Sequence, residues 1–187
     1  EGSYRFLRRV WNLGAANAAA IRAKRDMPAQ LPAELAALRR EIHLLLRQAN
    51  FDLHKFQFNT VASACMKMLN ALEKAPAGDG REAVLRECIG ILLRVLSPIT
   101  PHIAHGLWTE LGYDGDIMDA AWPEPLEAAL VQDEVELVLQ VNGKHRGTVC
   151  VQVGADKTAI ETAALATEGA QRYMEGKPAK KIIVVPG

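Results

Sequence analysis

The side chains best suited to chemistry lie in one basic stretch, Lys144-His145-Arg146. The ammonium of Lys144 and the planar fork of Arg146 are donors suited to phosphate oxygens, and His145 stands between them. A second basic cluster precedes the apolar end of the chain: Lys177, Lys180 and Lys181. Two such clusters on one small sheet favour contact with an RNA backbone without base reading. The alternative is that these cations keep a sheet soluble and guard its edge.

No other arrangement in the sequence indicates a catalytic or metal site. His102 and His105 lie three residues apart, a spacing that can place two metal ligands on one helical face. The zincin pattern and a third ligand are missing, so we interpret both as helix-surface histidines. The sequence has no GxSxG, Walker or GxGxxG motif, and no pattern of nucleophile and base. We therefore predict no catalytic residue, no metal site and no cofactor within this chain.

The basic stretch falls at the tip of a predicted β-hairpin. Apolar and polar residues alternate on both sides of Asn142-Gly143, a pair that favours a tight turn. A plain two-residue loop would mix the buried and exposed faces of the two strands. One extra residue, in a three-residue loop or in a bulge near Gly147, sets Leu137 opposite Val149 and restores one apolar face. We predict the extra residue.

Upstream of the hairpin, apolar residues recur at helical spacing in five segments. The segment over 82–96 is apolar on more than one side and should lie centrally. Residues 112–133 are rich in Gly, Asp and Pro, which favours an irregular strap anchored by Trp122. The expected helices run from Ser3 to the break at Asp26-Met27-Pro28, from Pro32 to Phe56, from a cap at Asn59 to the loop at Ala75, over 82–96, and from a cap at Thr100 through Leu111.

The predicted fold class is multidomain, α followed by α+β. A five-helix bundle is followed by a small ββααβ domain, in which short helices and a last apolar strand succeed the hairpin. The later elements are expected over 156–166, 168–174 and 182–185. We place the helical domain at 1–125, a linker at 126–133 and the α+β domain at 134–187.

The net charge is zero, but the charges are segregated along the chain. Residues 1–55 hold ten Lys or Arg against five Asp or Glu, whereas residues 110–136 hold nine acidic residues and no basic one. Residues 137–187 hold seven basic against four acidic residues. This distribution favours an anionic partner touched at two places, or else an ordinary solvated surface with an acidic linker.

The cysteines and the hydropathy favour a cytoplasmic protein. Cys65, Cys88 and Cys150 lie far apart in apolar stretches, with neither a disulfide framework nor a CxxC pair. We interpret all three as small buried hydrophobes. No apolar run approaches membrane-spanning length, so we expect no membrane partner.

Several motifs, in one order along the chain, resemble a known family. They are SYRFLRRVW at 3–11, FNT at 58–60, SPITPHI at 97–103, WPEP at 122–125, VNGKHRG at 141–147 and KKIIVVPG at 180–187. Together they are similar to the C-terminal region of bacterial leucyl-tRNA synthetases: a helical anticodon-binding-type domain and a small C-terminal domain. Two departures are His145, where the family commonly has an aliphatic residue, and the stop after Pro186-Gly187, where the family usually continues.

The resemblance implies a parent enzyme of class I that ligates leucine to its tRNA with ATP and Mg²⁺ and edits mischarged tRNA in a separate domain. The family's HIGH and KMSKS signatures are absent here. The expected role is therefore a tRNA-binding appendage, partnered by leucine tRNA and the remainder of the synthetase chain, and monomeric. The expected tRNA-binding residues are Lys144, His145, Arg146, Lys177, Lys180, Lys181, Arg8 and Arg9.

Two alternatives stay open from the sequence. A valyl- or isoleucyl-type synthetase would share the helical bundle but should lack this hairpin domain. A helical protein-interaction module would use apolar grooves of the bundle and show no salt-sensitive RNA binding.

Overall fold

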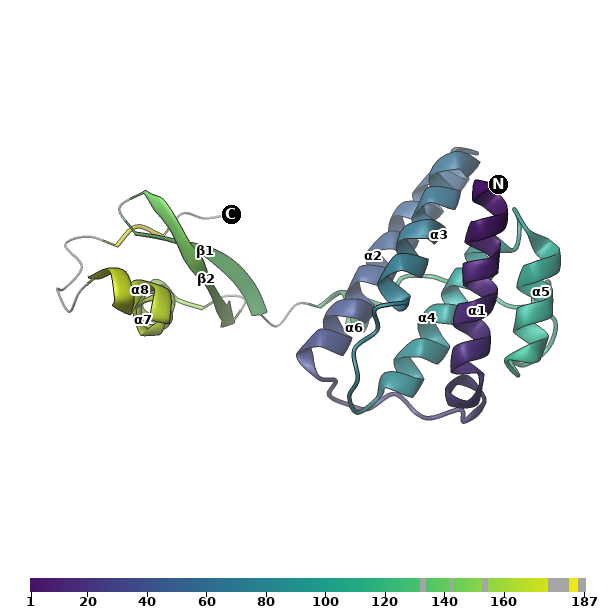
Figure 1. Ribbon diagram of the computed structural model, residues 1–187, viewed down its shortest axis with the longest axis horizontal. Helices are drawn as coiled ribbons and strands as arrows, with labels where there is room; N and C mark the ends of the chain where they lie inside the picture. The colour runs from purple at the N-terminus through teal and green to yellow at the C-terminus, as the bar shows by residue number, and fades with distance from the viewer. Residues whose placement is uncertain (132–133, 142, 153–154, 175–181, 185–187) are drawn as a thin grey trace. The chain divides into compact units, whose positions relative to one another are not determined.

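The computed structural model describes residues 1–131, 134–141, 143–152, 155–174 and 182–184. The chain divides into two compact units, Glu1–Val131 and Gln132–Gly187. The first unit is helical, and the second holds a two-stranded sheet with two short helices, as Figure 1 shows. The helices of the first unit are α1 (Gly2–Arg22), α2 (Ala33–His54), α3 (Phe58–Leu72), α4 (Arg81–Leu96), α5 (Pro101–Glu110) and the single turn α6 (Glu127–Leu130).

Helix α4 is the centre of the helical unit. It packs against α1, α2, α3 and α5, and apolar side chains on all its sides are buried, among them Leu85, Leu92 and Val95. This confirms the prediction that the helix over 82–96 lies centrally. Gly90 lets the ring of Tyr113 approach, since an added Cβ there would lie 3.0 Å from it. A continuous core of α1 to α5 side chains surrounds α4.

The helix starts differ in detail from the predicted caps. Helix α5 begins with Pro101 at its first position and Thr100 before it, as predicted, but the Thr100 hydroxyl makes no capping hydrogen bond. Helix α3 begins at Phe58, with Gln57 in the cap position, so the predicted cap at Asn59 is wrong. The cause is the turn before it, where Phe56 adopts a φ of 55° and the chain re-enters a helix two residues early.

Residues 112–131, which carry acidic but no basic side chains and are called the acidic segment below, lie over the bundle. The indole Nε1 of Trp122 donates a hydrogen bond to Asn50 Oδ1 of α2 at 2.9 Å, which confirms Trp122 as an anchor. Further along, α6 packs against α2, and the Arg40 guanidinium donates to the Leu130 carbonyl at 3.1 Å. We predicted a linker over 126–133; residues 126–131 belong to the helical unit, because these contacts hold them there.

The second unit is organised around an antiparallel hairpin of β1 (Glu134–Val141) and β2 (Lys144–Gln152). Helices α7 (Lys157–Ala166) and α8 (Glu168–Met174) pack on it. Asp156 caps α7, since its carboxylate accepts the Ala159 N–H at 2.7 Å. Among the side chains of this unit that the structure describes, those of Val149, Val151 and Ala170 are buried.

A last strand was predicted over 182–185. Residues 182–184 are described and are not in a strand, and residue 185 lies outside the described part of the chain. A strand requires a hydrogen-bonded neighbour, and none of the described residues pairs with 182–184. Among the helices that the structure describes, none is both long and apolar enough to span a bilayer.

Candidate nucleic-acid interface

The hairpin carries a bulge that displaces its basic tip. Leu137 pairs with Val149 and Val135 with Val151, which confirms the predicted register. Leu139 pairs with Gly147 but the next residue, Gln140, pairs with His145, so Arg146 is the extra residue. Gly147 has a φ of 125°, a conformation that side chains with a Cβ rarely adopt.

The three tip side chains have different surroundings. Lys144 and His145 are exposed, whereas Arg146 is half-buried. The Arg146 guanidinium carbon lies 3.6 Å from the ring centroid of Tyr173 on α8. Its Nε atom is covered and has no hydrogen-bond acceptor among the described residues. Lys144 and His145 therefore present donors to solvent, while Arg146 is held against a helix.

The second predicted cluster cannot be placed. Lys177, Lys180 and Lys181 lie outside the described residues. Their assignment to tRNA contact stays a prediction from the sequence.

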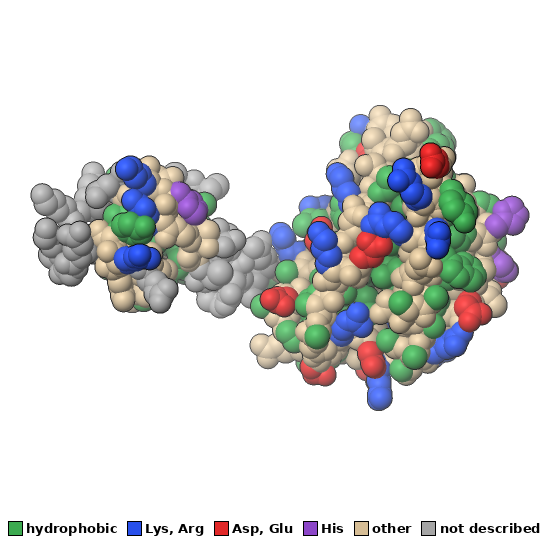
Figure 2. All heavy atoms as spheres, viewed as in Figure 1, with side chains coloured by type: hydrophobic (Ala, Val, Ile, Leu, Met, Phe, Trp, Pro, Cys, Tyr) green, Lys and Arg blue, Asp and Glu red, His purple; other side chains and the backbone are tan. Residues whose placement is uncertain are grey.

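Of the two predicted arginines of α1, Arg9 makes hydrogen bonds to neighbouring side chains. Arg9 donates from Nε to Glu73 Oε1 at 3.0 Å and from Nη2 to Asn70 Oδ1 at 2.7 Å. The hydrogen bond from Arg9 lowers the pKa of Glu73. Arg9 thus joins α1 to the end of α3 although its side chain is exposed, and Arg8 is exposed as well. Figure 2 shows cationic side chains interspersed with acidic ones on the helical unit, and Lys, Arg and His side chains on the small unit.

A buried ionic cluster behind the acidic segment was missed by sequence reasoning. Glu87 accepts from Arg39 Nε at 2.7 Å and from Arg39 Nη2 at 2.9 Å, and it lies 2.8 Å from His43 Nε2. Burial alone would raise the pKa of Glu87, but the hydrogen bonds from His43 and Arg39 outweigh it and lower the pKa to about 2. His43 Nδ1 accepts the Leu126 N–H at 3.1 Å. The cluster joins α2, α4 and the acidic segment.

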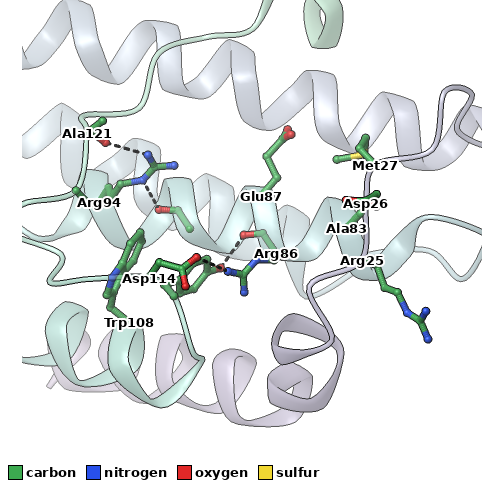
Figure 3. Close-up of a pocket in the computed structure, with 13 residues that line it drawn as sticks. Arg25, Asp26, Met27, Ala83, Arg86, Glu87, Arg94, Trp108, Asp114 and Ala121 are labelled. Atoms are coloured by element: carbon green, nitrogen blue, oxygen red, sulfur yellow. Dashed lines mark hydrogen bonds and ion pairs between the residues drawn. The ribbon is translucent and has the colours of Figure 1, made fainter.

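Figure 3 shows an open hollow lined by three arginines, Arg25, Arg86 and Arg94. Two of them bind backbone carbonyls: Arg86 donates to Ile21 O at 2.9 Å, and Arg94 donates to Gly90 O at 3.0 Å and Ala121 O at 2.9 Å. The hollow is also lined by Asp114, whose carboxylate bonds Lys24 at 2.6 Å. Arg86 thus joins α4 to the end of α1, and Arg94 joins α4 to Ala121, so the hollow is part of the scaffold.

The predicted metal-ligand candidates on α5, His102 and His105, are both exposed, and Cys65 and Cys88 are buried. His105 Nδ1 lies 3.4 Å from Asp116 Oδ1, and His102 is exposed on the same helix. Within the described ranges, no group of three His, Cys, Asp or Glu side chains is placed to hold a metal ion. Cys65 and Cys88 are buried free thiols, as predicted, and burial raises the pKa of Cys65 to about 12. The side chain of Cys150 lies outside the description.

The chain is similar to known proteins along its whole length. A family model described as the anticodon-binding domain of tRNA ligase matches residues 36–161. The leucine–tRNA ligase of Azoarcus sp. (strain BH72) is 62% identical over 194 residues, covering 100% of this chain and 22% of that protein. The leucine–tRNA ligase of Aromatoleum aromaticum is 58% identical, again over 100% of this chain and 22% of the relative. The chain thus spans about a fifth of the length of these relatives.

A solved structure has the same fold. It is the ternary complex of Agrobacterium radiobacter K84 agnB2 LeuRS with tRNA and LeuAMS, with a TM-score of 0.73 and 25% sequence identity. The match covers 99% of this chain and 24% of that one. The family match covers well over half of the residues, from α2 into α7. The chain belongs to the family of anticodon-binding domains of tRNA ligases.

Proposed function

We propose that this chain is the tRNA-binding part of a leucine–tRNA ligase, and that it holds leucine tRNA while the rest of the polypeptide activates leucine with ATP and transfers it. The observation that carries the proposal is the 62% identity of the whole chain to 22% of a leucine–tRNA ligase. The similar LeuRS of known structure was solved with tRNA, which supports RNA as the partner.

The basic hairpin is the part of this chain best suited to contact the tRNA backbone. Lys144 and His145 are exposed, and Arg146 is presented beside them by the bulge. Ammonium and guanidinium groups bind phosphate oxygens without regard to base sequence. We assign Lys144 and Arg146 to this contact. On the basis of the sequence alone, we also assign Lys177, Lys180 and Lys181 to it. Arg8 is the further candidate on the helical unit, since Arg9 is bound to Glu73.

The two units take different parts in the proposed function. The helical unit is an anticodon-binding-type bundle, while the small α+β unit carries the backbone contact. We place the sites for ATP and Mg²⁺, and the editing site, in the rest of the ligase. We also propose a monomeric ligase that acts in the cytoplasm.

A filter-binding titration tests the proposal. The purified 187-residue chain should retain a leucine tRNA transcript, with an affinity that falls steeply as salt rises, because bound cations release counterions from the phosphates. The chain alone should show no leucine-dependent ATP–pyrophosphate exchange. If the chain retained the transcript no better than a neutral polymer of the same length does, the RNA-binding role would be contradicted.

A further inference from the structure

The bulge in β2 brings Arg146 under helix α8. An ordinary hairpin would pair each residue of one strand with one of the other, but Leu139 and Gln140 skip Arg146 when they pair with Gly147 and His145. The extra residue is free of the strand ladder, so a bulge can re-aim its side chain. Arg146 is aimed at Tyr173, which lies in the last turn of α8.

The approach of α8 to the bulge is close enough to require a glycine. A Cβ added at Gly169 would lie 2.1 Å from the Arg146 carbonyl oxygen, far inside contact distance. Gly169 lies one turn before Tyr173, so the same helix that touches the Arg146 backbone also supplies the ring against its side chain. The backbone and the guanidinium of Arg146 are therefore both fixed by α8.

The guanidinium of Arg146 lies over the ring of Tyr173. The guanidinium carbon lies 3.6 Å from the ring centroid, within the range of a cation–π contact. Tyr173 remains 44% exposed, so the contact is at the surface rather than in the core. The covered Nε has no acceptor among the described residues, so the two terminal nitrogens of the fork are the donors to consider for a ligand.

We propose that Tyr173 is a positioning residue of the tRNA site, which holds Arg146 so that its two terminal nitrogens bind one phosphodiester. A planar fork binds two oxygens of a phosphate in parallel. Restraining a long side chain before binding lowers the entropy that binding would otherwise cost. The inference rests on the proposed function, because it names how one residue of that site is presented.

The ligand class follows from the geometry. A phosphodiester offers two oxygens to the guanidinium edge, while a stacked base would need a guanidinium face. Lys144, exposed near the same tip, adds a second cation for an adjacent phosphate. The alternative is a structural clip, in which Arg146 and Tyr173 only fasten α8 to the hairpin.

A double-mutant cycle separates positioning from fastening. The affinity of the full 187-residue chain for a leucine tRNA transcript is measured for Tyr173→Leu, Arg146→Ala and the double variant. Tyr173→Leu and Arg146→Ala should each weaken binding by about fivefold, as expected for one exposed charge–phosphate contact. The double variant should bind no more weakly than Arg146→Ala, because Tyr173 acts through Arg146.

Two conservative variants keep the test decisive even if Tyr173→Leu unfolds the small unit. Tyr173→Phe keeps the ring and should bind within about twofold of the unmutated chain. Arg146→Lys keeps the charge but loses the planar fork, and should lose binding about as much as Arg146→Ala. Melting curves of all variants show which are folded.

The outcomes distinguish the positioning role of Tyr173 from the tRNA contact at the hairpin. If Lys144→Ala and Arg146→Ala weaken binding but Tyr173→Leu or Arg146→Lys leaves it unchanged, the positioning role is refuted and the tRNA site stands. Equal fold losses for Tyr173→Leu in the presence and absence of Arg146 would also refute it, because Tyr173 would then act independently of Arg146. If neither Lys144→Ala nor Arg146→Ala weakens binding, the proposed tRNA contact at the hairpin itself fails.

Discussion

Replacing Glu87 with Gln should lower the stability of the helical unit, because it removes the carboxylate that pairs with Arg39. Glu87 receives hydrogen bonds from Arg39, and His43 lies 2.8 Å from it. The side chains of His43, Arg39 and Glu87 are 1%, 14% and 22% exposed, so solvent screens them little. Glu87→Gln has nearly the same volume but cannot carry the negative charge. It leaves the cation of Arg39 without a carboxylate in a largely buried place.

The size of the effect follows from the pKa of Glu87, which is lowered from 4.5 to about 2. This difference corresponds to about 3 kcal/mol of folding stability. Because the pKa is lower in the folded chain, the contribution is complete above pH 4.5 and is lost as the pH falls from 4.5 towards 2. Removing one partner of a buried ion pair has a similar cost, about 3 kcal/mol or more.

Urea unfolding followed by tryptophan fluorescence measures this contribution. All three tryptophans, Trp11, Trp108 and Trp122, lie in the helical unit, so the signal reports that unit. At pH 7 the Glu87→Gln chain should be less stable by about 3 kcal/mol. At pH 3 the difference should shrink, because Glu87 is then protonated in the unfolded state of the unmutated chain, whereas in the folded state, with a pKa of about 2, it still carries its charge. A difference below about 0.5 kcal/mol at pH 7, or one that does not change with pH, would refute the reasoning.

Glu73→Gln is the matched control for Glu87→Gln. Glu73 also receives hydrogen bonds from an arginine, Arg9, but the side chains of that pair are 34% and 46% exposed. Water and salt screen such a pair. The control should therefore change the urea midpoint only slightly at any pH.

Three further predictions follow from the backbone. Phe56→Gly should stabilise the helical unit by about 1 kcal/mol, because Phe56 is 80% exposed at a φ of 55°; Phe51→Gly, within α2, should destabilise it in the same urea assay. Gly169→Ala should lower protection from hydrogen exchange in β2, because its methyl meets the Arg146 carbonyl, whereas Gly2→Ala, with nothing within 4 Å, should not. Limited proteolysis should first cut between Val131 and Glu134, where the two units divide; equal resistance throughout would indicate one cooperative unit.

The elements with strong local patterns could be predicted from the sequence. The alternation around Asn142-Gly143 required an extra residue, and the structure has it at Arg146. The apolar residues on several sides of α4 placed that helix at the centre. Both inferences depend on the periodicity of apolar residues, which can be read from a short stretch of sequence alone.

The features that sequence reasoning missed depend on partners far apart in the chain. Glu87 lies more than forty positions from both Arg39 and His43, and no local pattern pairs it with them. The same holds for Arg9 with Glu73. The predicted strand over 182–185 had the right composition, but composition does not supply a pairing partner for residues 182–184.

The candidate site was predicted in part. Charge and hairpin position pointed to Lys144 and Arg146, and the structure leaves Lys144 exposed. The contact between Tyr173 and Arg146 had no sequence signal, because Tyr173 lies on α8, the second helix after β2.

The central claim is that the basic hairpin binds tRNA phosphates, and the salt dependence of binding tests it most directly. The affinity of the unmutated chain and of the Lys144→Ala, Arg146→Ala double variant for leucine tRNA is measured at several salt concentrations, with a melting curve for each. We expect weaker binding and a shallower salt dependence for the folded double variant. With two phosphate contacts removed, binding to the tRNA releases fewer counterions. Unchanged affinity and an unchanged salt slope in a folded double variant would contradict it.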